Sequence, residues 1–310
     1  MGPGTALVTG GTGFVGSHLA RRLATEGWEL HLIVRPGSNL DPIRDILGQA
    51  TLHAHDGSSS GMARILETAK PDVVFHLASL FLAQHRVEDI GPMVASNILF
   101  PTQLLDAMAA HGVRRLVNTG TQWQHYEDAE YSPVCLYAAT KQAFEVIIQY
   151  YVETSALRVV TLKLFDTYGP NDPRPKLFRL LDSAAKERKS LSMSPGEQKL
   201  DLVYIDDVVK AFVVGAGRLM DWMDETGGHE AFAVSSGNPL RLKDLVRLYE
   251  QAIGSELPIE WGGRPYRFRE VMVPWGKSSS IPGWKPEVSI EEGIRRMISL
   301  AVSGKPRDQK

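Results

Sequence analysis

The residues Thr9-Gly10-Gly11-Thr12-Gly13-Phe14-Val15-Gly16 decide the fold of this chain. They follow a short strand-like run, Thr5–Thr9, and open a helical pattern. The first glycine of the motif permits a tight turn, Gly13 lets the backbone approach a pyrophosphate, and Gly16 lets the helix pack closely on the strand. The N–H groups and the positive dipole end of the helix then attract the phosphates. The motif therefore predicts a dinucleotide-binding unit at the beginning of the chain.

Strand and helix patterns alternate through the rest of the first half. Strands are predicted at Glu29–Val34, Thr51–Ala54, Asp72–Leu77, Arg115–Thr119 and Arg158–Leu164, and helices at Phe14–Glu26, Gly61–Ala69, Pro92–His111 and from Tyr137 to about Thr154. Such alternation requires crossover connections, so it predicts an α/β fold with a Rossmann-type doubly wound parallel sheet. Pro101 cannot donate to the carbonyl of Asn97, which predicts a kink inside the helix that contains both residues.

After Leu164 the regular alternation of strand and helix patterns ends, and prolines and glycines become more frequent. Residues Asp166–Pro175 include three prolines and a glycine, so a loop is predicted there. The C-terminal third is irregular, and loops held by a rigid scaffold often carry function. We expect residues 1–164 and 202–234 to form the cofactor-binding Rossmann domain. Residues 165–201 and 235–310 are expected to form a smaller C-terminal domain that binds the substrate.

The composition excludes several classes of protein. The 310 residues include 34 Lys and Arg and 36 Asp and Glu, a net charge of -2 that offers no footprint for nucleic acid or an anionic membrane. Cys135 is the single cysteine, so neither an intramolecular disulfide nor a site of several thiolates can form, and no metal is expected. Short apolar runs and the lack of a signal-peptide pattern predict a soluble, cytoplasmic protein.

The end of the second predicted strand indicates which nicotinamide cofactor fits. NAD-binding proteins usually place an acid there to bind the ribose hydroxyls. This chain has Arg35 instead, which could clamp the 2′-phosphate of NADP, with Ser38 as a second donor. The pattern predicts a preference for NADP(H), and the alternative is that Arg35 is only a solvated surface residue. Asp56, after the third strand, is a candidate acceptor for the adenine amino group.

Tyr137 and Lys141 lie four residues apart at the start of a predicted helix, so they share one face with Cβ atoms roughly 6 Å apart. A free tyrosine titrates near pH ~10, and a neighbouring ammonium group is expected to lower that pKa. A hydroxyl at the end of the strand that begins at Arg115 could orient a reacting oxygen. Thr121 is the first candidate and Thr119 the second. The alternative for both threonines is a hydrogen bond to turn backbone.

The glycine motif, Asp56, His76-Leu-Ala, Thr121 and the Tyr137/Lys141 pair together resemble the extended short-chain dehydrogenase/reductase (NAD-dependent epimerase/dehydratase) family, whose members act mainly on nucleotide sugars. The stretches Leu136–Glu145, Phe165–Lys176 and Met193–Gln198 are similar to its CDP-abequose synthase branch of nucleotide-sugar 4-ketoreductases. The resemblance also implies a homodimer, formed through the helices that contain Pro92–His111 and Tyr137–Thr154.

The resemblance covers nearly the whole chain and assigns the site residues. The implied cofactor-binding residues are Gly10, Thr12, Gly13, Phe14, Val15, Gly16, Arg35, Ser38, Asp56, Gly57, Leu77, Ala78, Ser79, Asn97, Thr119, Tyr137, Lys141 and Phe165. The implied substrate-binding residues are Gln122, Trp123, Asp166, Arg174, Lys176 and Arg264, of which Arg264 is the first candidate for the nucleotide diphosphate because arginine supplies bidentate donors. Two residues depart from the family's pattern, Asp166 in place of Asn and Leu200 in place of the Arg that often precedes Asp201.

In the mechanism that the resemblance implies, Tyr137 gives a proton to the carbonyl oxygen, Lys141 holds the cofactor ribose and Thr121 orients the carbonyl. Dehydratases of the family need a further acid/base after the active Ser or Thr, and Gln122 and Trp123 cannot exchange a proton at neutral pH. We therefore expect NADPH-dependent reduction of the 4-keto group of a nucleotide-activated dideoxy or 6-deoxy sugar, as in deoxysugar biosynthesis. The alternatives are a nucleotide-sugar epimerase with bound NAD(P) and a non-catalytic NADP-binding scaffold or sensor.

Overall fold

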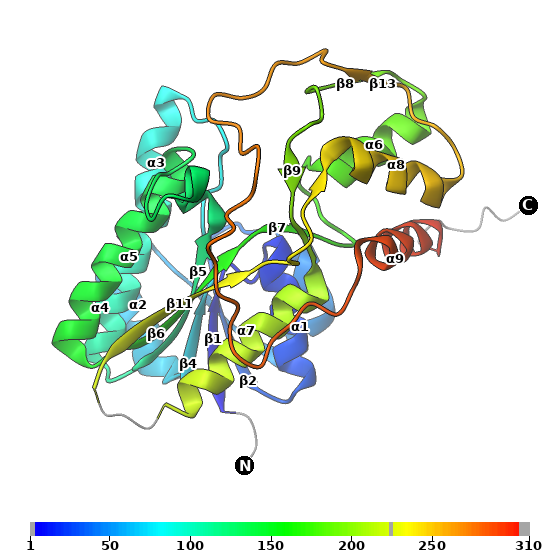
Figure 1. Ribbon diagram of the computed structural model, residues 1–310. Coiled ribbons are helices and arrows are strands. Elements are labelled where there is room, and N and C mark those ends of the chain that lie inside the picture. Colours follow the sequence, from blue (N-terminus) through cyan, green and yellow to red (C-terminus); the bar gives the residue numbers. More distant parts are fainter. Residues whose placement is uncertain (1–3, 223–225, 304–310) are drawn as a thin grey trace, which may run out of the picture.

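A computed structural model describes residues 4–222 and 226–303. Its centre is a parallel sheet of seven strands in the order β11-β6-β5-β4-β1-β2-β3 (Figure 1). The strands are β1 (Thr5–Thr9), β2 (Glu29–Val34), β3 (Ala50–Ala54), β4 (Val73–His76), β5 (Arg115–Thr121), β6 (Arg158–Leu164) and β11 (Gly228–Val234). The predicted α/β fold with a Rossmann-type parallel sheet is confirmed.

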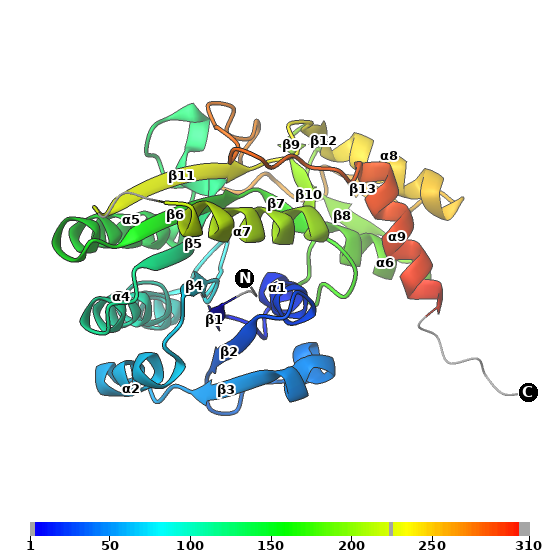
Figure 2. The ribbon, with the colours of Figure 1, turned by 90° about the horizontal axis from the view of Figure 1, so that it is seen from below.

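Helices cover both faces of this sheet (Figure 2). One face carries α2 (Ser59–Ala69), α4 (Phe100–Ala110) and α5 (Leu136–Ser155), and the other carries α1 (Phe14–Thr25) and α7 (Ile205–Met220). Because side chains alternate along a strand, Leu7 joins the buried cluster with Phe144, whereas Val8 joins the cluster with Phe212. Both residues are fully buried, which explains why these strands have no polar face in the sequence.

The helix predicted at Pro92–His111 is divided. It consists of α3 (Ile90–Val94), a π-helical turn at Ala95–Leu99, and α4. Pro101 lies in the first turn of α4 and is buried. The disruption predicted at Pro101 therefore takes the form of one wide turn that precedes the proline. Asn97 lies within this turn and its side chain points into the protein, where it is 2% exposed.

The later part of the chain forms a smaller layer beyond the carboxyl ends of the strands (Figure 1). Three small sheets pair β7 (Asp166–Tyr168) with β10 (Leu202–Tyr204), β8 (Leu191–Met193) with β13 (Ile259–Trp261), and β9 (Lys199–Leu200) with β12 (Leu240–Arg241). Helices α6 (Leu177–Glu187), α8 (Leu242–Ile253) and α9 (Ile290–Ser303) contribute to a third core cluster, which includes Leu181, Val246 and Ile294. Single-turn 3-10 helices lie at Val87–Asp89, Gln122–Gln124 and Tyr126–Asp128, and a longer one at Asp41–Gln49.

The prediction of a loop throughout Asp166–Pro175 is wrong for its first three residues. Asp166–Tyr168 forms β7 because Leu202–Tyr204 lies alongside it in parallel register. A three-residue strand is too short to leave a period-two pattern in the sequence. The division into residues 1–164 with 202–234, and 165–201 with 235–310, stays a prediction.

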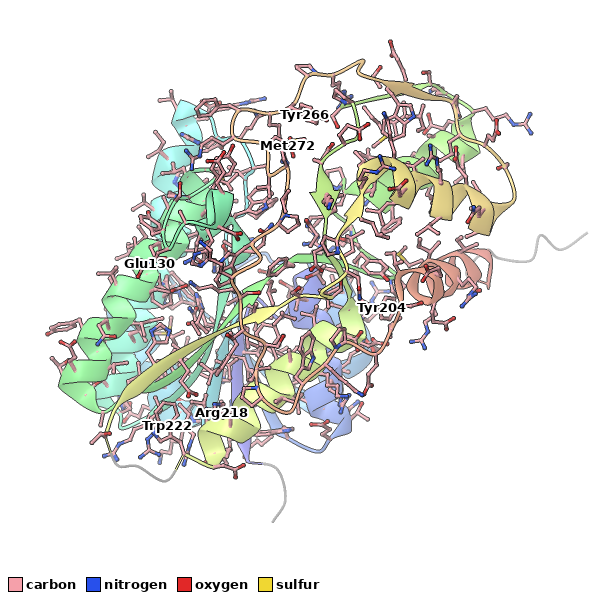
Figure 3. All side chains as sticks on the ribbon, viewed as in Figure 1. Glu130, Tyr204, Arg218, Trp222, Tyr266 and Met272 are labelled. Carbon is pink, nitrogen blue, oxygen red and sulfur yellow. The ribbon has the colours of Figure 1, made fainter. Side chains whose placement is uncertain are left out.

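Residues 264–280, which we call the strap, follow β13 and return across the carboxyl ends of the strands to the edge of the sheet, where Ser280 bridges to Ala233 of β11 (Figure 1). Figure 3 shows Tyr266 and Met272 of the strap at the end of the molecule opposite Arg218 and Trp222. No helix within residues 4–222 and 226–303 is both long and apolar enough to cross a bilayer.

Candidate active site

Two cavities lie at the carboxyl ends of the parallel strands, where open α/β sheets bind their ligands. The smaller, of about 260 Å³, is bounded by the glycine loop on one side and by the start of α5 on the other. The larger, of about 830 Å³, extends toward α6 and α8. The two share seven lining residues: Phe81, Gln122, Trp123, Asp166, Thr167, Arg174 and Lys176.

The glycine loop packs as its motif predicts. Gly10 has φ +74°, and a Cβ there would lie 2.6 Å from the backbone nitrogen of Ala78. A Cβ on Gly16 would lie 2.0 Å from the carbonyl oxygen of Gly10, so strand and helix could not approach this closely with any other residue. Gly13 caps α1 without a side-chain hydrogen bond, and the first residues of the helix line the smaller cavity. This cradle of backbone N–H groups fits a pyrophosphate.

The residues predicted to hold the adenosine end lie just outside the lining of the smaller cavity. Arg35 and Ser38 follow β2, and the Ser38 hydroxyl accepts a hydrogen bond of 3.1 Å from the Arg35 backbone N–H. Arg35 is exposed, and no carboxylate of the described residues forms an ion pair with its guanidinium. Asp56 follows β3 and accepts hydrogen bonds from the Ser58 hydroxyl and backbone N–H, which hold its pKa below the usual value.

Tyr137, Lys141 and Thr121 meet at the smaller cavity. Tyr137 and Lys141 occupy the first turns of α5, and Thr121 is the last residue of β5. Burial raises the pKa of Tyr137 above its ordinary value, and Cys135 adds to this, while a hydrogen bond with Ser79 opposes it. Burial lowers the pKa of Lys141 to about 8. The direction for Tyr137 is opposite to our expectation, because loss of water around the phenol outweighs the hydrogen bond with Ser79 and the positive charge of Arg174, which both lower the pKa.

Asn97 connects the loop after β4 to the first turn of α5. Its Oδ1 accepts from the Leu80 backbone N–H at 2.8 Å and from the Ser79 hydroxyl at 3.2 Å. Its Nδ2 donates to the Leu80 carbonyl and to the Thr140 hydroxyl, both at 3.0 Å. The Thr140 hydroxyl donates in turn to the carbonyl of Tyr137 at 2.7 Å. Asn97 therefore supports the site from behind the cavity wall, while Ser79 reaches the cavity itself.

The two candidate threonines have different partners. The Thr119 hydroxyl donates to the carbonyl of His76 at 2.8 Å, so it satisfies strand backbone, as the alternative reading of the sequence predicts. The Thr121 hydroxyl accepts a longer hydrogen bond, 3.3 Å, from the Trp123 backbone N–H and keeps its own proton for another acceptor. Thr121 is thus the hydroxyl available to a ligand in the cavity.

The larger cavity gathers most of the predicted substrate-binding residues. Its lining includes Gln122, Trp123, Asp166, Arg174 and Lys176. Arg174 forms an ion pair of 2.7 Å with Asp172, and Lys176 one of 3.5 Å with Asp166. Arg264 is the exception: it is exposed, outside the lining, and bonded only through its backbone N–H to Met193.

Sequence reasoning missed Phe81 and Arg267, which both line the larger cavity. The Phe81 ring packs edge-on against Tyr137 at 4.9 Å between centroids and lies 5.5 Å from the Trp123 ring. The guanidinium of Arg267 pairs with Glu270 at 2.7 Å. Phe81 lies in an irregular segment and Arg267 on the strap, where no periodic pattern shows which side chains turn inward.

The histidine and cysteine side chains of the described residues do not form a metal site. His53, on β3, bonds through Nε2 to Nδ1 of His31 at 2.8 Å. Among residues 4–222 and 226–303, no three side chains of His, Cys, Asp or Glu come together as metal ligands would. Burial raises the pKa of the Cys135 thiol, which disfavours the reactive thiolate.

The chain is similar in sequence to known nucleotide-sugar enzymes. The chain is 27% identical over 297 residues to the CDP-abequose synthase of Salmonella muenchen, covering 95% of this chain and 97% of the relative. It is 26% identical over 332 residues to a probable UDP-glucuronate 4-epimerase of Rhizobium meliloti, covering 94% and 95% of the two chains.

Among solved structures, the UDP-glucose 4-epimerase of Thermotoga maritima with UDP-glucose has a TM-score of 0.82 at 21% identity, covering 96% of this chain and 99% of that one. The UDP-glucose 4-epimerase of Thermus thermophilus with NAD has a TM-score of 0.80 at 22% identity, covering 97% and 100%. At these identities the likeness establishes the fold. The model of the NAD dependent epimerase/dehydratase family matches residues 6–220. The chain therefore belongs to this family of extended short-chain dehydrogenase/reductase enzymes.

Proposed function

We propose that this enzyme uses NADPH to reduce the 4-keto group of a nucleotide-activated 6-deoxy or dideoxy sugar. The observation that carries the proposal is Arg35, an exposed guanidinium without an ion pair among the described residues, at the end of β2. It stands where an NAD-binding protein usually has an acid, and it suits the 2′-phosphate of NADP. Similarity to CDP-abequose synthase over 95% of the chain supports the same class of substrate.

The site residues suit a proton donation to a carbonyl oxygen. Bound NADPH supplies the hydride. Tyr137 holds a proton at neutral pH, since burial raises its pKa, and its position on the cavity wall lets it donate to the substrate oxygen. Thr121 donates a second hydrogen bond to that oxygen. Lys141 binds the ribose of the cofactor.

The wall formed by Phe81 and Trp123 keeps water from Tyr137, which strengthens the polar interactions in the site. In the larger cavity, Arg267, Arg174 and Lys176 bind the nucleotide diphosphate, and Gln122 and Asp166 contact the sugar. Arg264 is exposed and lies outside the lining of this cavity, so we assign it no contact with the nucleotide.

A second candidate is 4-epimerisation of a nucleotide sugar with bound NAD(P). Two observations favour it. Several relatives, including that of Rhizobium meliloti, are named as 4-epimerases, and similar structures contain NAD. Tyr137, Lys141 and Thr121 serve this reaction as well, because it oxidises and then reduces the same carbon. The two reactions differ in whether NADPH is consumed.

The test follows NADPH absorbance while the enzyme meets a panel of nucleotide-linked 4-keto-6-deoxy sugars, with Tyr137→Phe as the inactive variant. Tyr150→Phe is the matched control, since Tyr150 is exposed on the same helix. Loss of NADPH in the wild type and in Tyr150→Phe, with at least a ~100-fold slower rate in Tyr137→Phe, supports the reductase. A sugar that changes configuration while NADPH persists identifies an epimerase. No reaction in any mixture, with NADPH still bound, leaves the non-catalytic scaffold as the better hypothesis.

A further inference from the structure

Gln124 is a fully buried amide that joins the end of β5 to α5. Its Oε1 accepts a hydrogen bond of 3.0 Å from the backbone N–H of Thr121. Its Nε2 donates to Oε1 of Glu145 at 2.8 Å and to Oε1 of Gln142 at 2.7 Å. Gln142 follows Lys141 directly, and Glu145 lies one turn after Lys141, on the helix that also carries Tyr137. One side chain therefore contacts both of the elements that supply the candidate catalytic groups.

The Glu145 carboxylate, to which Gln124 donates, also forms a buried ion pair. Oε2 of Glu145 lies 3.4 Å from Nζ of Lys163 on β6, and both side chains are less than 10% exposed. Lys163 also bonds to Nε2 of His125 at 2.8 Å. The His125 ring stacks on Trp275 of the strap, with centroids 3.9 Å apart and planes 14° apart. Because a buried charge needs partners on all of its polar atoms, this arrangement keeps the Glu145 carboxylate in one place for Gln124.

An amide is the group that this position requires. It must accept from one N–H and donate two hydrogen bonds from a single nitrogen, and among neutral side chains the amides of Asn and Gln do both. The surroundings are also tight, since a Cβ on Gly120 would lie 3.2 Å from Oε1 of Gln124 and 3.0 Å from Cγ of Lys163. An apolar residue of equal size would leave the Thr121 N–H and one carboxylate oxygen without partners.

We infer that Gln124 is a positioning residue, which fixes the placement of Thr121 relative to Tyr137 and Lys141 and thereby sets kcat. The inference rests on the proposed function, because it assumes that Thr121 donates to the reacting oxygen. Gln124 itself does not line either cavity, so it does not touch a ligand there. Its effect on the rate is therefore indirect, through the placement of Thr121 relative to α5.

The kinetic test is a double-mutant cycle of Gln124→Met and Thr121→Val. Gln124→Met is expected to lower kcat about tenfold, since small misplacements of a catalytic group are costly, with KM for the sugar and Kd for NADPH within about twofold of wild type. In the Thr121→Val background the same change should have no further effect on kcat. Losses that multiply in the double variant, or an unchanged kcat in Gln124→Met, overturn the inference.

Thr161→Val is the matched control for removal of a buried hydrogen bond. Thr161 is fully buried on β6 and bonds to Asn118 and His229, away from both cavities. We expect this variant to lose thermal stability but keep kcat. If Gln124→Met does not fold, two variants replace it: the single variant Gln124→Glu, and the double variant Gln124→Glu with Glu145→Gln. The double variant exchanges the amide and the carboxylate, so that one donor again faces one carboxylate. Recovery of kcat in this double variant supports the inference, and equal loss in both variants overturns it.

Hydrogen exchange of the Thr121 amide separates this inference from the proposed function. Loss of the bond to Gln124 should speed exchange at this amide about tenfold in Gln124→Met, whichever reaction the enzyme performs, whereas Gln124→Glu keeps an oxygen that accepts from the Thr121 N–H and should not speed it. A wild type that does not consume NADPH contradicts the proposed reductase but leaves this measurement intact, and the double-mutant cycle is then run on epimerisation. An unchanged exchange rate at Thr121 overturns the positioning role even in an active reductase.

Discussion

The guanidinium of Arg267 lies over the ring of Trp123, 5.4 Å from its centroid, and so connects the strap to the segment that follows β5. The contact holds Arg267 against the wall of the larger cavity, where a diphosphate can accept paired hydrogen bonds from its planar fork. The neighbouring Arg264 is exposed and outside the lining, so the two arginines form a natural pair for comparison.

We expect Arg267→Ala to raise KM for the nucleotide sugar about tenfold to a hundredfold, the usual cost of losing hydrogen bonds to a charged group. Arg264→Ala should change KM by less than about threefold. Steady-state kinetics of the two variants measure KM for the nucleotide sugar, and titration with the nucleoside diphosphate alone measures how each variant binds the diphosphate. A larger effect for Arg264 would mean that the strap rearranges when the substrate binds.

Arg35 is expected to determine the choice of cofactor. Arg35→Asp removes the cation and supplies the acid that NAD-binding proteins use, so kcat/KM for NADPH should fall roughly 10- to 100-fold and that for NADH should rise. The comparison of kcat/KM for the two cofactors measures this directly. Arg22→Ala, which removes an exposed arginine paired with Glu26 on α1, is the control and should leave the ratio unchanged. Equal use of both cofactors by the wild type would contradict the NADPH assignment.

The pKa of Lys141 predicts how cofactor use varies with pH. Burial lowers this pKa to about 8, against the opposing charge of Glu145. The free enzyme therefore loses the positive charge as pH rises through about 8, while Tyr137 keeps its proton because burial raises its pKa. We expect kcat/KM for NADPH to be constant below about pH 7 and to fall above about pH 8, since this ratio reports groups in the free enzyme.

The variant Lys141→Arg provides the check on that assignment. A guanidinium remains charged throughout this range, so the fall in kcat/KM above about pH 8 should disappear even if the rate is lower overall. A profile that keeps the same fall in Lys141→Arg would assign it to another group.

We propose that the exposed apolar side chains of α5 and the π-helical turn bury against a second copy of the chain, as the family resemblance implies. Val146 and Tyr150 lie one turn apart on α5 and are 64% and 61% exposed, and Leu99 is 53% exposed. Val146→Glu with Tyr150→Glu should convert a dimer to a monomer, because buried unpaired charges disfavour association. Analytical ultracentrifugation measures the change, and Met220→Glu, at the end of α7, is the control. A wild type that sediments as a monomer would contradict the proposal.

The central sheet could be predicted from the sequence because its strands are buried on both faces. The bounds of β1, β2 and β6 agree with the predicted ranges, β3 begins one residue earlier than predicted, and β4 is one residue shorter at each end. β5 extends to Thr121, two residues beyond the predicted end at Thr119, because Gly120 and Thr121 continue the ladder with β6. That extension places Thr121 at the cavity, which Thr119 also lines, but the Thr119 hydroxyl already donates to the carbonyl of His76.

The candidate site could be predicted only where a local motif fixes geometry. The glycine loop and the Tyr137/Lys141 spacing depend on one turn of chain, so both lie at the cavity as expected. Phe81, Arg267 and Gln124 depend on segments that meet only in the folded protein. Gln124 in particular acts through Gln142 and Glu145, about twenty residues later in the chain, and no pattern in the sequence connects them.

The path of the chain also constrains how such an enzyme can diversify. β11, which completes the central sheet beside β6, lies in the sequence between two of the stretches that line the larger cavity, residues 166–202 and 249–274. Neither stretch can be replaced by that of a homologue on its own, since residues of both pack together in the third core cluster and β8 pairs with β13. In a chimaeric protein that takes β7 to β9 from a homologue but keeps its own strap, the two sides of the cavity would come from different proteins and would not fit together. New substrate preferences should therefore arise by coordinated point changes on both sides of β11 rather than by the transfer of one block.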